Sequence, residues 1–369
     1  MNTLFFYGTL RHVPLLECVL GRSSDTLDLA EAQLPDHVAL SSPDGHYPVL
    51  RPQRGTATAG VIVRALSDQD IARLNHYEGG FAYELRKVTL STGESAAVYI
   101  PDASVQSLDT AWDFQAWQDR WADMTLWAAK EVMDAFGRMS PADIATRFPR
   151  IRARAWSKVL AQSGRHGLGV LRGQVDVVSR TQAYSNFYAL EDVQLRHEEF
   201  DGGMSDTLDR AVLVSSDAAI VLPYDPDRDR VLLVEQIRLG PIGRADPVCW
   251  QMEPVAGLID PGETPEQAAR REGAEEADLV FQRLEPAGEC YASPGAATDF
   301  FHLFVGLCDL PDGSAGLGGE PTEGENIRSH LMSFDALLNM AEDRRVANTP
   351  LAMLTYWLGH HRARLRNRA

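Results

Sequence analysis

The spacing of apolar and polar positions divides the chain into three regions. In the first, residues 1 to about 105, apolar positions alternate with polar ones, as at 59–65 and 96–100, between turn-forming residues. Alternation with a period of two is typical of half-buried strands, so this region predicts a small sheet. Apolar positions at helical spacing follow, from residue 107 to about 163, and include Trp112, Trp117, Trp121 and Trp127. We expect these rings to form a packing face rather than a binding platform.

Strands return in the third region. Apolar runs predict strands at residues 174–178, 195–200, 210–214, 219–222, 230–236 and 301–306, and helices at 333–342 and 350–361 close the chain. A Gly-rich, acidic loop at 309–324 is expected to be mobile. At 369 residues the chain is long enough for two domains with separate cores. The pattern therefore predicts an α/β (α+β) protein with a helical region between two domains.

Four carboxylates gather around one predicted helix of the third region: Glu263, Glu272, Glu275 and Glu276. A turn at 257–262 leads into this helix, and Pro265 stands near its first position, where a missing N–H costs nothing. Glu272 and Glu276 are four residues apart, so they project from one face. Because close carboxylates repel one another, a divalent cation that prefers oxygen ligands is the usual reason for such a cluster. The segment predicts a metal and pyrophosphate site.

This spacing resembles the Nudix box. The matching positions are Gly257, Glu263, Arg271, Glu272, Glu275, Glu276 and Leu279. Two positions depart from the pattern, because Gly273 replaces an apolar residue and Asp278 replaces the final glycine. Neither change removes a carboxylate. The alternative is a solvated helix that happens to be rich in Glu, which so many matching positions disfavour.

Segments outside the box resemble the ADP-ribose pyrophosphatase branch of the Nudix hydrolases, over about residues 170–369. They are residues 234–238, residues 250–256, Pro294 and the Glu-x-Glu-x-Ile-Arg segment at 323–328. The resemblance implies an α/β/α sandwich with a mixed sheet. It also implies Mg²⁺- or Mn²⁺-dependent hydrolysis of the pyrophosphate bond of ADP-ribose, to AMP and ribose 5-phosphate, or of a related nucleoside diphosphate sugar. Similar enzymes carry Ser/Thr-Glu or Asp-Glu just after the Pro-Gly, where this chain has Ala-Ala-Thr-Asp-Phe at 296–300, and this difference bears on substrate preference.

The resemblance also implies roles for single residues. The metal ligands would be Glu272, Glu276, Glu325 and the carbonyl of Ala256, with Glu323 activating or positioning water. Gly257, Glu263, Arg271 and Glu275 would be structural positions of the box. Arg238 would contact phosphate or the terminal ribose; the alternative is a surface arginine paired with Glu235. Similar enzymes are homodimers whose N-terminal strands cross over and help to hold the adenine, and residues 186–188 could supply stacking rings or pack in the core.

The first region resembles the gamma-glutamylcyclotransferase-like family. The segments that carry this resemblance are residues 5–11, 46–50, 74–80 and 83–88. It implies a small β-barrel-like fold in which Tyr7, Gly8, Thr9 and Leu10 form the substrate-binding loop and Glu78 acts as acid and base. A carboxylate beside Tyr7 and Tyr77 could have the raised pKa that such proton transfer requires. The alternative is that Glu78 merely ends a helix, in a domain kept for recognition or assembly.

Charge and cysteine content narrow the class of protein further. The net charge of −17 disfavours nonspecific binding to nucleic acid or to anionic membranes. The four cysteines lack metal-ligand or redox spacing, and the N-terminus lacks the features of a signal peptide. We therefore expect a cytoplasmic protein with reduced thiols, whose partner is a small molecule and which needs neither nucleic acid nor membrane.

Three domain ranges summarise the prediction: a gamma-glutamylcyclotransferase-like domain at 1–105, a helical linker at 106–168 and a Nudix hydrolase domain at 169–369. This order resembles bacterial proteins grouped under tellurite resistance, a label that supplies no mechanism. Two other functions remain open. One is a sensor that binds ADP-ribose or a nucleotide sugar without catalysis. The other is a gamma-glutamyl cyclotransferase that acts through the N-terminal domain.

Overall fold

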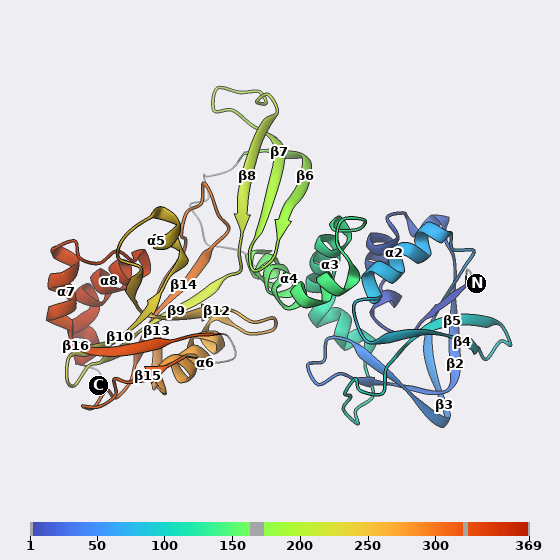
Figure 1. Cartoon of the computed structure of the whole chain (residues 1–369), viewed down its shortest axis with the longest axis horizontal. Coiled ribbons are helices and arrows are strands. Elements are labelled where there is room, and N and C mark those ends of the chain that lie inside the picture. Colours follow the sequence, from blue (N-terminus) through green and yellow to red (C-terminus); the bar gives the residue numbers. More distant parts are fainter. Residues whose placement is uncertain (1–2, 163–172, 320–323, 368–369) are drawn as a thin grey trace. The chain divides into compact units, whose positions relative to one another are not determined.

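The computed structural model describes residues 3–162, 173–319 and 324–367 (Figure 1). The chain forms two compact units, Met1–Arg210 and Ala211–Ala369. Each unit has its own hydrophobic cluster, as expected for a chain of this length. No helix of the described residues is long and apolar enough to cross a membrane.

The first unit is built on a five-stranded sheet with the order β2-β3-β1-β5-β4. Its strands are β1 (Leu4–Phe6), β2 (Asp28–Ser41), β3 (Pro48–Arg64), β4 (Tyr83–Thr89) and β5 (Ser95–Pro101). Strand β1 lies in the middle, antiparallel to β3 and parallel to β5. The 3₁₀ helix η1 (Thr9–Arg11), helix α1 (Val13–Leu20), the 3₁₀ helix η2 (Ser24–Thr26) and helix α2 (Asp68–Glu78) complete this part. The alternating pattern did not single out β2, although it pairs along most of β3.

Helices α3 (Phe114–Asp134) and α4 (Pro141–Gln162) pack in the core of the first unit. Trp117 and Trp121 are buried there with Leu15 and Leu74, so the expected packing face is confirmed. The hydroxyl of Ser140 accepts from the backbone N–H of Asp143, which caps the start of α4. The stretch expected as a helical linker therefore shares its core with α1 and α2.

A buried ion pair joins α3 and α4 to the hairpin of β6 (Val175–Ser185) and β7 (Ala189–His197). Arg154, 1% exposed, bonds the Glu131 carboxylate and donates to the carbonyls of Asn186 and Phe187 in the hairpin turn. The hydroxyl of Ser185 donates to the same carboxylate at 3.1 Å. Strand β8 (Leu208–Val214) is the third strand of this sheet, in the order β6-β7-β8.

The second unit is a sandwich around a mixed sheet with the order β13-β14-β9-β10-β16-β15. The strands are β9 (Ala218–Asp225), β10 (Arg230–Ile237), β11 (Trp250–Glu253), β12 (Val255–Leu258), β13 (Arg283–Tyr291), β14 (Phe300–Leu307), β15 (Leu317–Gly318) and β16 (Ile327–Ser333). Strand β11 pairs with β10, and β12 pairs with β9. The β9–β14 pair is parallel and the β9–β10 and β10–β16 pairs are antiparallel, so the expected mixed sheet is confirmed.

Helices cover both faces of this sheet (Figure 1). Helices α7 (Phe334–Glu342) and α8 (Thr349–Arg366) pack on Ile220, Leu222 and Tyr224 of β9. Because side chains alternate along a strand, Val221 faces the opposite side, where it lies near Phe281 at the end of α6 (Pro265–Ala277). The short helix α5 (Leu239–Arg244) follows β10. This layering places α6 and its carboxylates directly against β12 and β9.

The buried pair predicts a measurable loss of stability. Glu131→Ala should lower the free energy of unfolding of the first unit by about 3–5 kcal/mol, because it leaves the Arg154 charge buried without its partner. Urea unfolding followed by tryptophan fluorescence measures this change. The control is Glu84→Ala, which breaks the exposed pair with Arg86 and should cost less than about 1 kcal/mol. Equal losses from the two substitutions would show that the buried pair does not hold the helices.

Candidate active sites

The carboxylate helix α6 has strong local determinants. Thr264 and Gln267 form a capping box, in which each side chain bonds the backbone N–H of the other residue. Pro265 occupies the first helical turn, as expected. These residues determine where the helix begins. The position of the first turn in turn determines that Glu272 and Glu276 face the preceding loop.

Glu272 and Glu276 lie against the loop that precedes the helix. The Glu276 carboxylate accepts from the backbone N–H of Ala256 at 3.1 Å. The Glu272 carboxylate lies so close to Gly257 that a Cβ there would stand 1.8 Å from Glu272 Oε1. A glycine at this position therefore lets strand β12 and the carboxylate meet.

Burial raises the pKa of both carboxyls. The pKa of Glu272 rises to about 7 because burial, with repulsion from Glu275 and Glu325, outweighs the nearby Arg271. The pKa of Glu276 rises to about 8, mainly through burial and further through Glu272 and Glu325. Carboxylates that are both desolvated and mutually repelling are stabilised in their ionised form by a bound cation.

Arg271 links the structural positions of the box. Its guanidinium bonds Glu263 at 2.9 and 3.0 Å, Glu272 at 2.6 Å and Glu275 at 3.0 Å. It also donates to the carbonyl of Leu258 at 2.9 Å. The loop and the helix are thereby held by one side chain, with every donated bond directed to the protein's own oxygens.

The two departures from the box have physical explanations. A Cβ on Gly273 would stand 2.3 Å from the ring of Phe281, so this ring fills the space of the missing apolar side chain. Asp278 is the C-cap of α6 in the left-handed conformation, at φ 51° and ψ 41°. Asp is one of the few residues other than Gly that adopt this conformation readily. Both departures therefore keep the geometry of the helix.

Arg238 lies near the carboxylates but has a different partner from the one expected. Its guanidinium bonds Glu253 at 2.7 and 2.8 Å, whereas Glu235 bonds His330 at 2.8 Å. The expected alternative of a pair with Glu235 is therefore wrong. The charges of Glu276 and Glu325 act on Arg238, which places it at the same site.

Glu325 is half-buried and its charge acts on both Glu272 and Glu276. Glu323, the expected water-positioning residue, lies outside the described residues. In the described part of the chain, no three His, Cys, Asp or Glu side chains are grouped closely enough to hold a metal ion as they stand. The donor chemistry nevertheless fits a hard divalent cation, because the groups that converge here are carboxylate oxygens.

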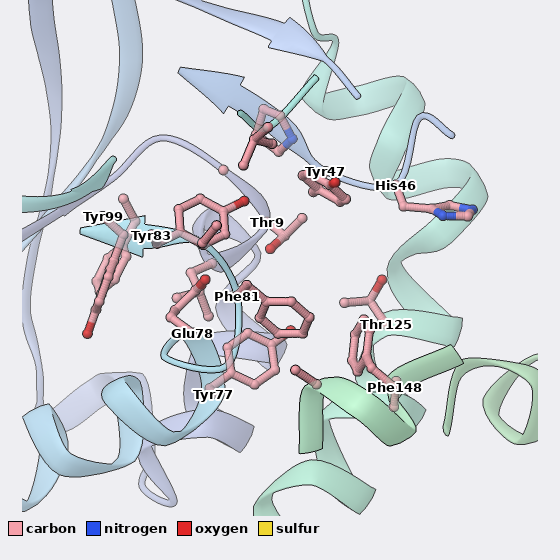
Figure 2. Close-up of a pocket in the computed structure, with 18 of the residues that line it drawn as sticks. Thr9, His46, Tyr47, Tyr77, Glu78, Phe81, Tyr83, Tyr99, Thr125 and Phe148 are labelled. Carbon is pink, nitrogen blue, oxygen red and sulfur yellow. The ribbon is translucent and has the colours of Figure 1, made fainter. Parts of the chain in front are cut away.

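The first unit contains a cavity of about 410 Å³, which lies within the usual range of small-molecule sites. The expected binding-loop residues Tyr7, Gly8, Thr9 and Leu10 all line it, and so does Glu78. Figure 2 shows Glu78 between the rings of Tyr83 and Tyr77, with Phe81 and Phe148 further into the cavity. The structure thus brings together all five residues that the sequence placed in this site.

The carboxyl of Glu78 is half-buried in the wall of the cavity. It is the last residue of α2, and burial alone raises its pKa to about 7. Three tyrosines surround it: Tyr7, Tyr77 and Tyr83. Burial is the largest cause of their raised pKa values, and the negative charge of Glu78 is a smaller one. They therefore stay neutral hydroxyls beside a carboxyl that can be ionised or protonated near pH 7.

The cavity also has walls that the sequence did not indicate. Its lining includes residues of α3 and α4, at positions far from the family-like segments: Met124, Thr125, Ala128, Ala145, Phe148, Pro149 and Arg152. Helical spacing of apolar residues predicts only that a face is buried. Nothing local could have shown that part of this face borders a cavity rather than a core.

The two parts of the chain are similar to different known proteins. A family model described as the NUDIX domain matches residues 215–351, and one described as gamma-glutamyl cyclotransferase, AIG2-like, matches residues 4–119. The ADP-ribose pyrophosphatase of Escherichia coli K12 is 35% identical over 196 residues, which is 53% of this chain and 93% of the relative. The ADP-ribose pyrophosphatase of Haemophilus influenzae is 31% identical over 195 residues, 52% of this chain and 88% of the relative.

Two further similarities are weaker. The GDP-mannose pyrophosphatase of Cronobacter sakazakii is 30% identical over 145 residues, 39% of this chain and 74% of the relative. A solved structure titled "Crystal structure of ADP compounds hydrolase" aligns at a TM-score of 0.40 and 19% identity, over 53% of this chain and 98% of its own.

The matched residues contain α6 with its carboxylates in one unit and the Glu78 cavity in the other. The chain belongs to the Nudix hydrolases through its C-terminal part, as a pyrophosphohydrolase, and carries an N-terminal domain of the AIG2-like gamma-glutamyl cyclotransferase family.

Proposed function

We propose that the C-terminal part hydrolyses the pyrophosphate bond of ADP-ribose to AMP and ribose 5-phosphate, or that of a related nucleoside diphosphate sugar. The pair of the half-buried Glu272 and the buried Glu276, against the loop at Gly257, carries this proposal. The ADP-ribose and GDP-mannose pyrophosphatases among the relatives support the substrate class. A sensor without catalysis is disfavoured, because all four carboxylates of the box are present and two of them, Glu272 and Glu276, are retained at a cost in desolvation.

Different residues have different roles in the proposed hydrolysis. Water attacks one phosphorus and the bridging oxygen leaves with the bonding electrons, so negative charge grows on the phosphate oxygens. Glu272, Glu276, Glu325 and the carbonyl of Ala256 would hold Mg²⁺ or Mn²⁺, which neutralises this charge and lowers the pKa of bound water when present. Glu323 is proposed to position the water, and Arg238, fixed by Glu253, to contact phosphate or ribose.

We propose that the catalytic domain spans residues 169–369, with 1–105 and 106–168 before it. A match of 196 residues is longer than the whole of Ala211–Ala369, so similarity to the pyrophosphatases extends to residues before that unit, where β6 and β7 lie. We also propose a homodimer formed through the Nudix domain. The hairpin supports it, because it leaves apolar side chains exposed: Val175, Val177, Val178, Tyr184, Phe187, Tyr188 and Leu190.

Glu276→Gln should reduce kcat for ADP-ribose hydrolysis by at least about a hundredfold, because one anionic ligand is lost where charge develops. Steady-state assays at saturating Mg²⁺ measure the change. The matched control is Glu275→Gln on the same helix, whose carboxylate is 44% exposed and bonds Arg271 instead. Retention of more than about a tenth of the wild-type kcat by Glu276→Gln would exclude it as a ligand.

Removal of divalent cations should affect the activity of one site and not that of the other. Chelation should abolish pyrophosphate hydrolysis, and added Mg²⁺ or Mn²⁺ should restore it, because desolvated carboxylates alone offer no positive charge to the phosphates. Any reaction at the Glu78 cavity should continue, because no metal chemistry is assigned to it. Colorimetric phosphate release with a coupled phosphatase measures the first activity. Full hydrolysis after exhaustive chelation would contradict the metal assignment.

The Glu78 cavity supports a second function, gamma-glutamyl cyclotransfer. In that reaction the neutral α-amino nitrogen of a γ-glutamyl amide attacks its own γ-carbonyl carbon. A C–N bond forms, the original amide C–N bond breaks, and the products are 5-oxoproline and a free amine. One proton leaves the attacking nitrogen and one reaches the leaving nitrogen, and Glu78 is placed to carry it. A carboxyl with a pKa of about 7 is suited to both halves of this transfer.

The pH dependence of this second activity follows from Glu78. Because the reaction needs both the ionised form of Glu78 and a neutral α-amino group, kcat/KM for a γ-glutamyl amide should fall about a hundredfold per pH unit below about pH 7, tenfold from each group. Glu78→Gln should lower kcat by about 100- to 10,000-fold. Release of 5-oxoproline, followed by chromatography, measures both. Glu84→Gln, which changes an exposed carboxylate on β4, is the control, and an equal effect of the two substitutions would remove Glu78 from the reaction.

A further inference from the structure

The wall of the Glu78 cavity formed by α3 and α4 lies outside the segment that resembles cyclotransferases. That segment ends at residue 119, whereas the wall begins at Met124. This wall is therefore a property of this chain's own helices. In Figure 2, Thr125 and Phe148 project from α3 and α4 toward the side of the cavity opposite Glu78.

The chemistry of this wall is apolar. Five of its side chains are hydrocarbon or thioether groups, and the hydroxyl of Thr125 is its hydrogen-bonding group: Met124, Thr125, Ala128, Ala145, Phe148 and Pro149. The Phe148 ring meets Phe81 edge-on at 4.9 Å between centroids. Such a surface favours apolar ligand atoms and gains nothing from a charged one.

Arg152 of α4 is the charged lining residue contributed by these helices, and it is already engaged. Its guanidinium lies 3.4 Å from the Asp44 carboxylate and contacts the ring of His46. Asp44 also accepts from the hydroxyl of Ser42 at 2.7 Å. The His46 ring packs edge-on against Trp121 and points away from the Glu78 end of the cavity in Figure 2. The positive charge of Arg152 is thus matched by the carboxylate beside it.

The position of the reacting group decides what must contact this wall. The α-amino nitrogen has to lie at Glu78 to lose its proton, and the γ-glutamyl part then occupies the end lined by Tyr7–Leu10 and the tyrosines. The leaving amine extends from the γ-carbonyl in the other direction. The walls that remain for it are the one made by α3 and α4 and the segment at Tyr47 and Pro48, and of these the helical wall is the larger contributor of lining residues.

We propose that α3 and α4 form the leaving-amine subsite of the Glu78 cavity and that this subsite takes a neutral, apolar amine, aliphatic or aromatic, rather than an amino acid with a free carboxylate. This inference rests on the cyclotransferase function proposed above. The reaction forms the lactam C–N bond, breaks the amide C–N bond and passes one proton through Glu78 to the leaving nitrogen. A carboxylate on the leaving group would lose its water against Phe148 and Met124 without gaining a partner.

The test compares two substrates that differ in this group, γ-glutamyl benzylamide and γ-glutamylglycine, with the full chain. The wild-type kcat/KM should be at least about tenfold higher for the benzylamide. Phe148→Ala should lower the ratio of the two kcat/KM values at least about tenfold. Phe148→Leu, which keeps an apolar side chain, should restore most of that ratio. An unchanged thermal unfolding temperature shows that each variant is folded.

A second readout does not depend on turnover. Calorimetric binding to Glu78→Gln should show the same preference for the benzylamide and the same loss with Phe148→Ala. A preference for γ-glutamylglycine that disappears with Arg152→Ala would overturn the inference, because Arg152 would then bind a carboxylate. Equal turnover of the two substrates overturns the subsite and leaves the cyclotransferase function standing. Absence of 5-oxoproline from every γ-glutamyl compound overturns that function and the inference with it.

Discussion

Both sites of this protein depend on carboxylates that are kept from water near the C-terminal ends of helices. Glu78 is the last residue of α2, and Glu276 is the next-to-last residue of α6. The helix dipole presents partial negative charge there, so it adds to the cost of ionising a buried carboxyl. A fold retains such groups only where a ligand or a transferred proton relieves the cost. The two units thus share this electrostatic feature, although the functions proposed for them differ.

The cost of ionising the carboxyl is offset differently in the two units, because different residues surround Glu276 and Glu78. Around Glu276 there are other carboxylates, Glu272 and Glu325, whose repulsion further raises its pKa. Such a group attracts multivalent positive charge. Around Glu78 there are hydroxyl groups of tyrosines, which stay neutral and add no fixed charge. That surrounding favours a carboxyl that exchanges protons. The residues next to each carboxylate are therefore what support a metal site in one unit and an acid–base site in the other, as proposed above.

The parts of the sites that could be predicted from sequence are those fixed by local spacing. The capping box at Thr264 sets the phase of α6, and this phase brings Glu272 and Glu276 to one face. The contacts that could not be predicted join distant segments. Phe281 replaces the missing apolar residue at Gly273, and Arg238 pairs with Glu253 rather than Glu235. The alternation that indicated β3 did not indicate its partner β2, because strand pairing depends on tertiary contacts. For the same reason, the sequence predicted a linker where α3 and α4 pack in the core of the first unit and line its cavity.

The acidic balance of the chain constrains how the pyrophosphatase site binds an anion. With a net charge of −17, the protein as a whole repels phosphates. Arg271 does little to offset this repulsion, because it donates to four oxygen-bearing groups of the box and loop. The charge of Arg238, which is proposed to contact phosphate or ribose, is partly balanced by Glu253. On the function proposed above, most of the positive charge that attracts the substrate would come from a bound cation. Metal binding would then govern substrate affinity as well as the chemical step, and Arg271 would maintain the carboxylate geometry on which the cation depends.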